Sequence, residues 1–122
     1  MIGLGFDLCQ IERIEKAMET HGFLCRYFTP EEQAYLEKKG KAASQSAAAM
    51  FAAKEALLKA MGVGLGGGIA LGEIGVCHDA SGAPSYRLTG EAAAKAAALG
   101  VTRTHLTLTH EMGVAGAVVV LE

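Results

Sequence analysis

The chain has 122 residues, of which 51% are hydrophobic and 20% are charged, and its formal net charge is −2. This composition is typical of a folded globular protein, excludes an intrinsically disordered one, and leaves room for a single domain over residues 1–122. Because the net charge is close to zero, no general attraction to nucleic acid or to an anionic membrane is expected.

The three cysteines are odd in number and far apart, without the CxxC spacing of a metal site, so we interpret them as reduced thiols. The N-terminus lacks the basic start and the cleavage region of a signal peptide, and the longest apolar run, 47–53, is too short to span a membrane. These features predict a cytoplasmic protein. The 16 glycines predict close approaches between backbones.

The opening segment, 2–8, has the alternation of a strand with one apolar face, because apolar residues at the even positions alternate with Gly3, Gly5 and Asp7. The two glycines would let a neighbouring backbone or a ligand come close. Asp7 has two interpretations. It could cap the helix that follows, which this residue alone favours, or it could hold a cation.

Two helices are predicted in the next part of the chain. Ile11, Ile14 and Met18 have the spacing of an amphipathic helix that ends near Thr20. The stretch Thr29-Pro30-Glu31-Glu32 combines a capping residue, a proline at the first helical position and an acid three residues after the cap, and therefore predicts a second helix reaching to about Gly40.

The centre of the chain is predicted to be one helix that starts near Ser44 and is stopped by Gly62. Its residues are apolar nearly all round, so the helix should be buried. It nevertheless carries Lys54, Glu55 and Lys59, and buried charges are costly unless they are paired or bind a ligand. Glu55 and Lys59 are four residues apart, which fits either an ordinary helix ion pair or a shared ligand.

The glycine-rich stretch 62–68 matches the spacing GxGxxG, but a helix precedes it and a strand follows it, which is the reverse of a dinucleotide-binding unit. A Walker A loop is excluded as well, since no Gly-Lys-Ser/Thr follows. The remaining interpretation is a loop whose backbone N–H groups could line a phosphate.

The second half of the chain is predicted to contain a hairpin (69–78 and 85–89), a helix (91–99), and two strands (101–110 and 114–121). In the first of these strands His110 shares a side with apolar residues, while His105 lies on the polar side; His110 could serve structure or chemistry. The last strand is apolar on both faces, which indicates an oligomer interface. The fold class is therefore α+β: a small, antiparallel-rich sheet packed with helices.

Three motifs together resemble the 4′-phosphopantetheinyl transferase superfamily, in its small bacterial holo-[acyl-carrier-protein] synthase type. They are Gly5-Phe6-Asp7-Leu8, then Phe51-Ala52-Ala53-Lys54-Glu55-Ala56 with Lys59, and finally Leu106-Thr107-Leu108-Thr109-His110. Length and element order agree, so the resemblance covers essentially the whole chain. It implies a single domain with the 4′-phosphopantetheinyl transferase fold that works as a homotrimer with sites between subunits.

The resemblance also implies the reaction: transfer of 4′-phosphopantetheine from coenzyme A to a serine of apo acyl carrier protein, with release of adenosine 3′,5′-bisphosphate, in fatty acid biosynthesis. It implies that Asp7 and Glu55 hold Mg²⁺ and that Glu55, Lys59 and His110 are catalytic. Coenzyme A would contact Lys59, Gly62, Gly64 and His110, and the carrier protein would dock on Arg13 and Arg26. The general base is left open between Glu55, the first choice, and Lys59 with a lowered pKa.

The sequence departs from the family pattern at two notable positions. Met50 stands where an arginine usually precedes Phe-Ala-Ala-Lys-Glu, and Val63 replaces the usual threonine of Gly-Thr-Gly. Thr107 and Thr109 replace serines but keep the hydroxyl groups. Two alternatives also stay open: a non-catalytic oligomeric binding module, and a transferase that serves polyketide or peptide carrier domains.

Overall fold

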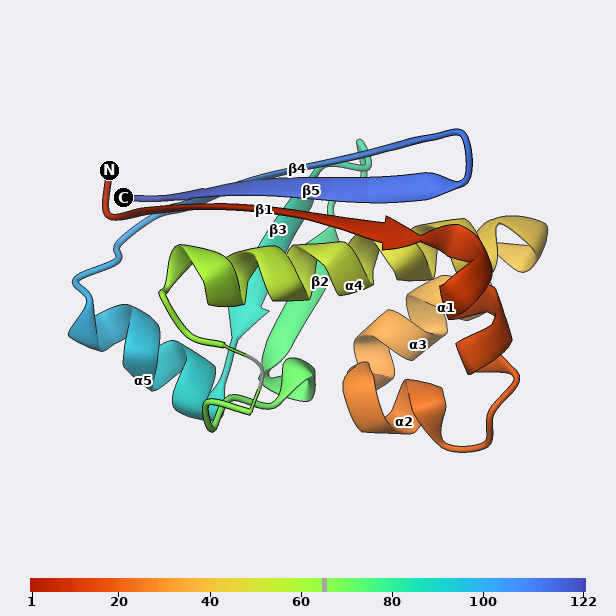
Figure 1. Cartoon of the computed structure of the whole chain (residues 1–122), viewed down its shortest axis with the longest axis horizontal. Helices are drawn as coiled ribbons and strands as arrows, with labels where there is room; N and C mark the ends of the chain where they lie inside the picture. The colour runs from red at the N-terminus through yellow and green to blue at the C-terminus, as the bar shows by residue number, and fades with distance from the viewer. Residues whose placement is uncertain (65) are drawn as a thin grey trace.

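The computed structural model describes residues 1–64 and 66–122. Its centre is one long helix with a three-stranded antiparallel sheet on one side and shorter helices and a hairpin on the other (Figure 1). The helices are α1 (Ile11–Met18), α2 (Phe23–Tyr27), α3 (Pro30–Glu37), α4 (Ala43–Ala60) and α5 (Gly90–Ala98). The sheet has the order β1 (Gly3–Gln10), β5 (Val114–Leu121), β4 (Thr104–Glu111), and the hairpin pairs β2 (Ile74–His78) with β3 (Pro84–Leu88). The predicted α+β class is confirmed.

Helix α4 is the core of the molecule, as its composition predicts. Most of its residues between Ala47 and Leu58 are buried, and Gly62 ends the helix with a φ of 72°, a left-handed conformation that suits glycine. Met50, where the family usually has an arginine, is completely buried in this core.

Strand β1 lies directly against α4, and its two glycines make this possible. A Cβ atom added to Gly5 would lie 1.9 Å from the carbonyl oxygen of Ala56, and one added to Gly3 would lie 2.1 Å from that of Ala60. The predicted close approach of a neighbouring backbone is thus confirmed. It also places Asp7, which shares this face of the strand, beside α4.

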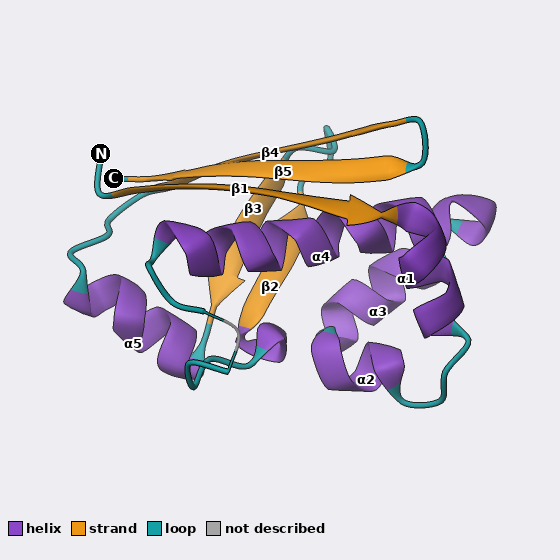
Figure 2. Cartoon of the chain, viewed as in Figure 1, coloured by secondary structure: helices purple, strands orange, loops and turns teal. Residues whose placement is uncertain are grey.

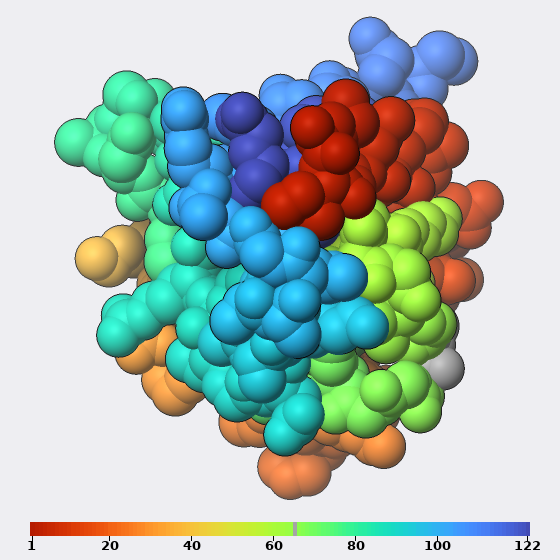
Figure 3. Space-filling model, turned by 90° about the vertical axis from the view of Figure 1, so that its left-hand side faces the viewer, coloured from red at the N-terminus to blue at the C-terminus, as the bar shows by residue number. Residues whose placement is uncertain are grey.

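The apolar side chains of β1 therefore point away from the helix. Leu4, Phe6 and Leu8 are 55–59% exposed on the outer face of the sheet, where they adjoin the half-buried Val118 and Val120 of β5. No helix covers this face among the described residues (Figure 2). The two ends of the chain are paired here, with Gly3 opposite Leu121 (Figure 3).

The N-terminal helices match the predictions with one addition. The capping box of α3 is formed as expected, since the Glu32 N–H donates to the Thr29 hydroxyl and the Thr29 N–H donates to the Glu32 carboxylate. The helix ends at Glu37, slightly earlier than predicted, and a short 3₁₀ turn leads into α4. Helix α2, which was not predicted, packs Phe23 and Tyr27 against Phe51 of α4.

The hairpin and the last helix differ from the predictions in detail. Strand β2 begins at Ile74 rather than at Ile69, because residues 71–73 form a 3₁₀ turn. Thr89 occupies the cap position of α5, but its side chain makes no capping hydrogen bond. The Glu73 carboxylate accepts the N–H of Glu91 instead, at 2.7 Å. No helix in the described part of the chain is long and apolar enough to cross a membrane.

Candidate active site

Asp7 of β1 faces α4 and binds a lysine of that helix. Its Oδ1 atom accepts a hydrogen bond from Lys59 Nζ at 2.7 Å, and the same ammonium group donates to the carbonyl oxygen of Phe6 at 3.2 Å. The following helix begins at Ile11, with Gln10 at its cap position. The interpretation of Asp7 as a helix cap is therefore wrong. The interpretation of Glu55 and Lys59 as an ordinary helix ion pair is also wrong, because Lys59 is bound to Asp7.

Glu55 lies half-buried on α4, one turn before Lys59, close enough to Asp7 for the two carboxylates to influence each other. Burial and, after it, the negative charge of Asp7 raise the pKa of Glu55, while Arg13 and Lys59 oppose this effect. The site thus holds two neighbouring carboxylates with opposing cations beside them. Such an arrangement favours the binding of a further cation, because it would relieve the repulsion between the two acids.

Lys59 is a poor candidate for a general base. Its side chain is 58% exposed, and the hydrogen bond from Lys59 to Asp7, with the attraction of that carboxylate, raises the pKa of the ammonium group above its ordinary value. The lowered pKa that this role requires is not found. Lys59 is instead a positive charge held beside Asp7.

A small hollow of about 160 Å³ adjoins the two charged residues of α4. It is lined by Glu55, Leu58, Lys59, Val63 and Gly64. Gly64 has open space where a Cβ would stand, whereas Gly62, also predicted to lie at this wall, is not among the lining residues and serves to end the helix. Leu65 of the predicted glycine loop lies outside the described residues.

The donor set suits magnesium better than a metal that needs several side-chain ligands. The described residues contain no group of three or more His, Cys, Asp or Glu side chains placed to hold a metal ion. Mg²⁺ is commonly held by one or two carboxylates, with water and phosphate oxygens at its other positions. Asp7 and Glu55 therefore fit Mg²⁺ bound together with a phosphate ligand.

His110 is not part of this cluster within a single chain. It shares the apolar side of β4, as predicted, and this side faces α4. Its Nε2 atom is 3.0 Å from the side-chain amide nitrogen of Gln45, near the start of α4. Ten residues separate Gln45 from Glu55, a distance of about 15 Å along the helix. His105, by contrast, is exposed on the outer side of the sheet and bonded to Glu122.

The two arginines expected to bind a partner are both exposed. Arg13 lies in the first turn of α1, with its Nη2 atom 4.0 Å from Cys9 Sγ, and its charge lowers the pKa of Glu55. Arg26 lies on α2 over the ring of Tyr27.

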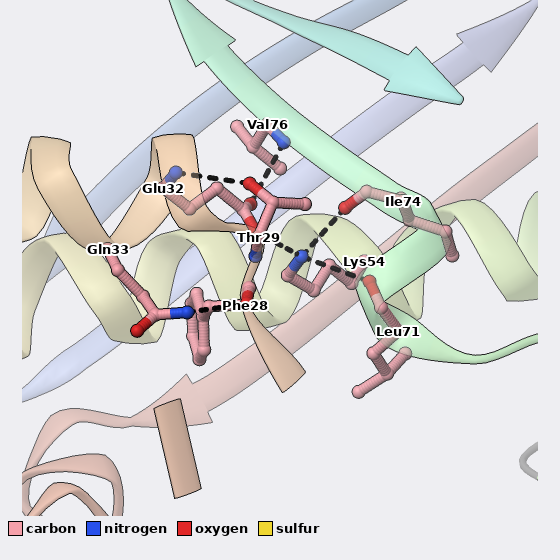
Figure 4. Close-up of polar contacts among 8 residues, drawn as sticks. All are labelled: Phe28, Thr29, Glu32, Gln33, Lys54, Leu71, Ile74 and Val76. Atoms are coloured by element: carbon pink, nitrogen blue, oxygen red, sulfur yellow. Dashed lines mark hydrogen bonds and ion pairs between the residues drawn. The ribbon is translucent and has the colours of Figure 1, made fainter. Parts of the chain in front are cut away.

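A buried ion pair adjoins the site, and only half of it was anticipated. Lys54, whose charge predicted a partner, is bound to Glu32 of α3 at 2.8 Å, and both side chains are inaccessible to solvent (Figure 4). Glu32 was interpreted only as a capping residue. Its second role has no sequence signal, because 22 residues separate the two partners.

Comparison with known proteins identifies the family. Residues 3–115 match the model of the 4′-phosphopantetheinyl transferase superfamily, and the chain belongs to this family. The resemblance drawn from the three motifs and the enzyme class that it implied are confirmed. This membership favours an enzyme over a non-catalytic binding module.

Relatives are similar over nearly their whole length. A holo-[acyl-carrier-protein] synthase of Granulibacter bethesdensis is 43% identical over 128 residues, which cover 99% of this chain and 88% of the relative. The crystal structure of the Neisseria meningitidis synthase has a TM-score of 0.87 and 34% identity, with 100% of this chain and 98% of the other covered. The Helicobacter pylori synthase, solved in complex with coenzyme A, has a TM-score of 0.82 and 32% identity, covering 98% and 99% of the two chains.

Proposed function

We propose that this chain transfers 4′-phosphopantetheine from coenzyme A to a serine of an apo acyl carrier protein, in a Mg²⁺-dependent reaction that serves fatty acid biosynthesis in the cytoplasm. One observation carries the proposal: Asp7 of β1 binds Lys59 of α4 and lies near enough to Glu55, one turn earlier on that helix, for the two carboxylate charges to interact, beside a hollow with a glycine in its wall. The coenzyme A complex of the Helicobacter pylori relative supports the choice of donor.

Asp7 and Glu55 are the residues that would hold Mg²⁺, which when bound neutralises charge on the diphosphate of coenzyme A. Lys59, whose pKa is raised, stays protonated and lines the hollow, where it would contact phosphate oxygens. Val63 and Gly64 form the wall beside those phosphates. These groups position the diphosphate and neutralise its charge. These are the main contributions of a protein to phosphoryl-type transfer.

Glu55 is the proposed general base. The serine hydroxyl of the carrier protein gives its proton to the Glu55 carboxylate as the serine oxygen attacks the β-phosphorus. The bond from that phosphorus to the bridging oxygen breaks, and adenosine 3′,5′-bisphosphate leaves with the electron pair. Asp7 holds Lys59 in its charged form by raising the pKa of the ammonium group, so Lys59 cannot accept the proton and the Glu55 carboxylate is favoured as the base.

A homotrimer is the proposed working form. Two observations support it: the exposed apolar face of β1 and β5, and the separation of His110 from Glu55 within one chain. Subunits packed through this face would cover it. A site shared between subunits would let His110 of one chain contact the coenzyme A held by another. Contacts of His110 and Gly62 with coenzyme A are part of this proposal.

The carrier protein is proposed to dock on Arg13 and Arg26, the exposed arginines of α1 and α2. Carrier proteins in this reaction are acidic, and arginine forks bind carboxylates with defined geometry.

Mass analysis of a carrier protein tests the proposed activity. An apo acyl carrier protein is incubated with the chain and coenzyme A before the measurement. The carrier should gain one phosphopantetheine group in the presence of Mg²⁺ and none with a chelator. A parallel incubation with peptide or polyketide carrier domains measures the carrier preference. An unmodified carrier in the presence of Mg²⁺, with coenzyme A intact, would overturn the proposal.

A further inference from the structure

Lys54 is completely buried, yet each of its three ammonium protons has an acceptor. The Nζ atom donates to Glu32 Oε1 at 2.8 Å, to the carbonyl oxygen of Leu71 at 3.1 Å, and to that of Ile74 at 2.7 Å (Figure 4). An ammonium group has three donors, so this set leaves none unsatisfied. Burial lowers the pKa of Lys54, and Glu32 opposes that shift. The pair is satisfied without any contact with solvent or ligand.

Glu32 ties the same segment from the other side. Its Oε2 atom accepts the N–H of Val76 at 2.9 Å, while Oε1 accepts the N–H of Thr29 in addition to the Lys54 bond. The two charged side chains therefore fasten residues 71–76 to both α3 and α4. They are the buried charged residues of the described chain.

The fastened segment leads back to the candidate active site. Upstream of it, Val63 donates its N–H to Leu58 at the end of α4 and lines the hollow beside Glu55 and Lys59. Farther along the chain, Lys54 attaches Leu71 to α4 through the carbonyl oxygen of that residue. Lys54 precedes Glu55, and consecutive residues of a helix point about 100° apart. One turn of α4 thus carries Glu55, which lines the hollow, and Lys54, which holds Leu71 farther along the chain from the wall.

We infer that Lys54 and Glu32 are a positioning pair that fixes residues 71–76 to α4 and, through them, the glycine-containing wall of the hollow in which coenzyme A phosphates bind. The inference rests on the proposed function for the identity of the ligand. Neither residue touches substrate. Their effect is exerted on coenzyme A binding through the wall. Of the two carboxylates that would hold Mg²⁺, Glu55 lies on another face of the helix and Asp7 lies on β1.

The test is the double variant Lys54→Met with Glu32→Gln, which removes both charges and keeps the side-chain volumes, so that no unpaired charge is left in the core. Its KM for coenzyme A should rise by roughly tenfold or more, while kcat and the Mg²⁺ concentration for half-maximal activity change by less than about threefold. Val119→Ala, a cavity variant of β5 that makes no bond to residues 71–76, is the control for lost stability and should keep the wild-type KM.

A folded double variant with the wild-type KM for coenzyme A would overturn the inference, as would an equal rise of KM in Val119→Ala. Hydrogen exchange of the wild-type protein tests the same pair if the double variant does not fold. The amides of residues 71–76 should be protected in the free protein, and coenzyme A should slow exchange at Val63 and Gly64, which line the hollow. Fast exchange of the Val76 amide would contradict the anchoring. Failure of the wild type to modify any carrier would instead reject the proposed function, and the exchange of the free protein would still test the anchor.

Discussion

Lys59 Nζ lies 2.7 Å from Asp7 Oδ1 and so joins α4 to β1 across 52 residues of sequence. The ammonium group of Lys59 is therefore the counter-ion of Asp7, the carboxylate that we propose as a Mg²⁺ ligand. Lysine and metal ion are expected to compete for Asp7, because each neutralises the same charge. Metal binding would then release Lys59 toward the phosphates in the adjoining hollow.

Replacement of Lys59 by methionine should increase the affinity of the free protein for Mg²⁺ and reduce transfer. Loss of one neighbouring positive charge should strengthen metal binding by roughly fivefold, since such a charge is worth about 1 kcal/mol near the surface. Transfer should fall by about a hundredfold, because one charged contact to the phosphates is lost. Calorimetric titration with Mg²⁺ and steady-state kinetics measure the two effects.

The control for this experiment is Lys38→Met, which removes an exposed lysine at the end of α3. Mg²⁺ affinity and transfer should both stay at the wild-type level. A weaker affinity for Mg²⁺ in Lys59→Met would show that the lysine supports the metal instead of competing with it.

Glu55→Gln should abolish transfer without loss of the fold. The amide keeps the size of the side chain but neither accepts a proton from serine nor carries the charge that would hold Mg²⁺. We expect a decrease in kcat on the order of a thousandfold. Glu37→Gln, at the exposed end of α3, is the matched control. Substantial activity of Glu55→Gln at saturating Mg²⁺ would remove Glu55 as both ligand and base.

The raised pKa of Glu55 predicts a specific pH dependence of stability in the absence of metal. A carboxyl group whose pKa is higher in the folded state favours folding when it is protonated, and this contribution is lost as pH rises through the folded-state pKa. Glu55→Gln does not titrate. Its free energy of unfolding relative to wild type should therefore increase with pH over the interval above the ordinary glutamate pKa.

Urea unfolding of both proteins in buffers with a chelator measures this difference. Added Mg²⁺ should reverse it for the wild type, because an ion bound to the folded state stabilises that state. A constant difference across the acidic and neutral range would mean that Glu55 has its ordinary pKa in the folded protein.

Gly5→Ala should separate β1 from α4. The added methyl group would lie 1.9 Å from the carbonyl oxygen of Ala56, which is backbone and cannot yield without moving the strand. We expect a loss of about 3 kcal/mol in stability and a clear loss of Mg²⁺ affinity, because Asp7 moves with the strand. Gly72→Ala, where the nearest atom lies at 4.0 Å, is the control and should be close to neutral. A stable Gly5→Ala variant with normal Mg²⁺ affinity would contradict the packing described for β1.

Local patterns predicted most of the secondary structure, since the capping box at Thr29 and the stop at Gly62 are determined by their own neighbours. The alternation of β1 was also predictable from the sequence. The sequence did not indicate that the apolar side of this strand points away from α4. The face that packs on α4 bears Gly3 and Gly5. A hydrophobicity pattern cannot identify this face as buried, because glycine has no side chain. The late start of β2 depends on Lys54, which binds the carbonyl groups of Leu71 and Ile74 from 17 and 20 residues away.

The candidate site was predictable to a similar degree. Asp7, Glu55 and Lys59 came from motifs whose spacing is local, and the structure brings these three together. Their partners depend on how β1 lies across α4, so the bond between Lys59 and Asp7 and the raised pKa of Lys59 could not be derived from the sequence. His110 is separate from them within one chain, because the order of strands places β5 between β1 and β4.

Arg26→Glu should weaken binding of the carrier protein and leave coenzyme A binding unchanged. Arg26 is exposed on α2, whereas Arg13 lies close enough to Glu55 to lower its pKa, so Arg26 is the cleaner test of docking. We expect the KM for the carrier to rise by about tenfold and kcat to change little, since an attractive charge becomes a repulsive one. The effect should shrink as salt concentration increases, because exposed charges are screened. Lys95→Glu on α5, at the opposite end of the molecule, is the control (Figure 1). An unchanged KM for the carrier at low salt would place the docking surface elsewhere.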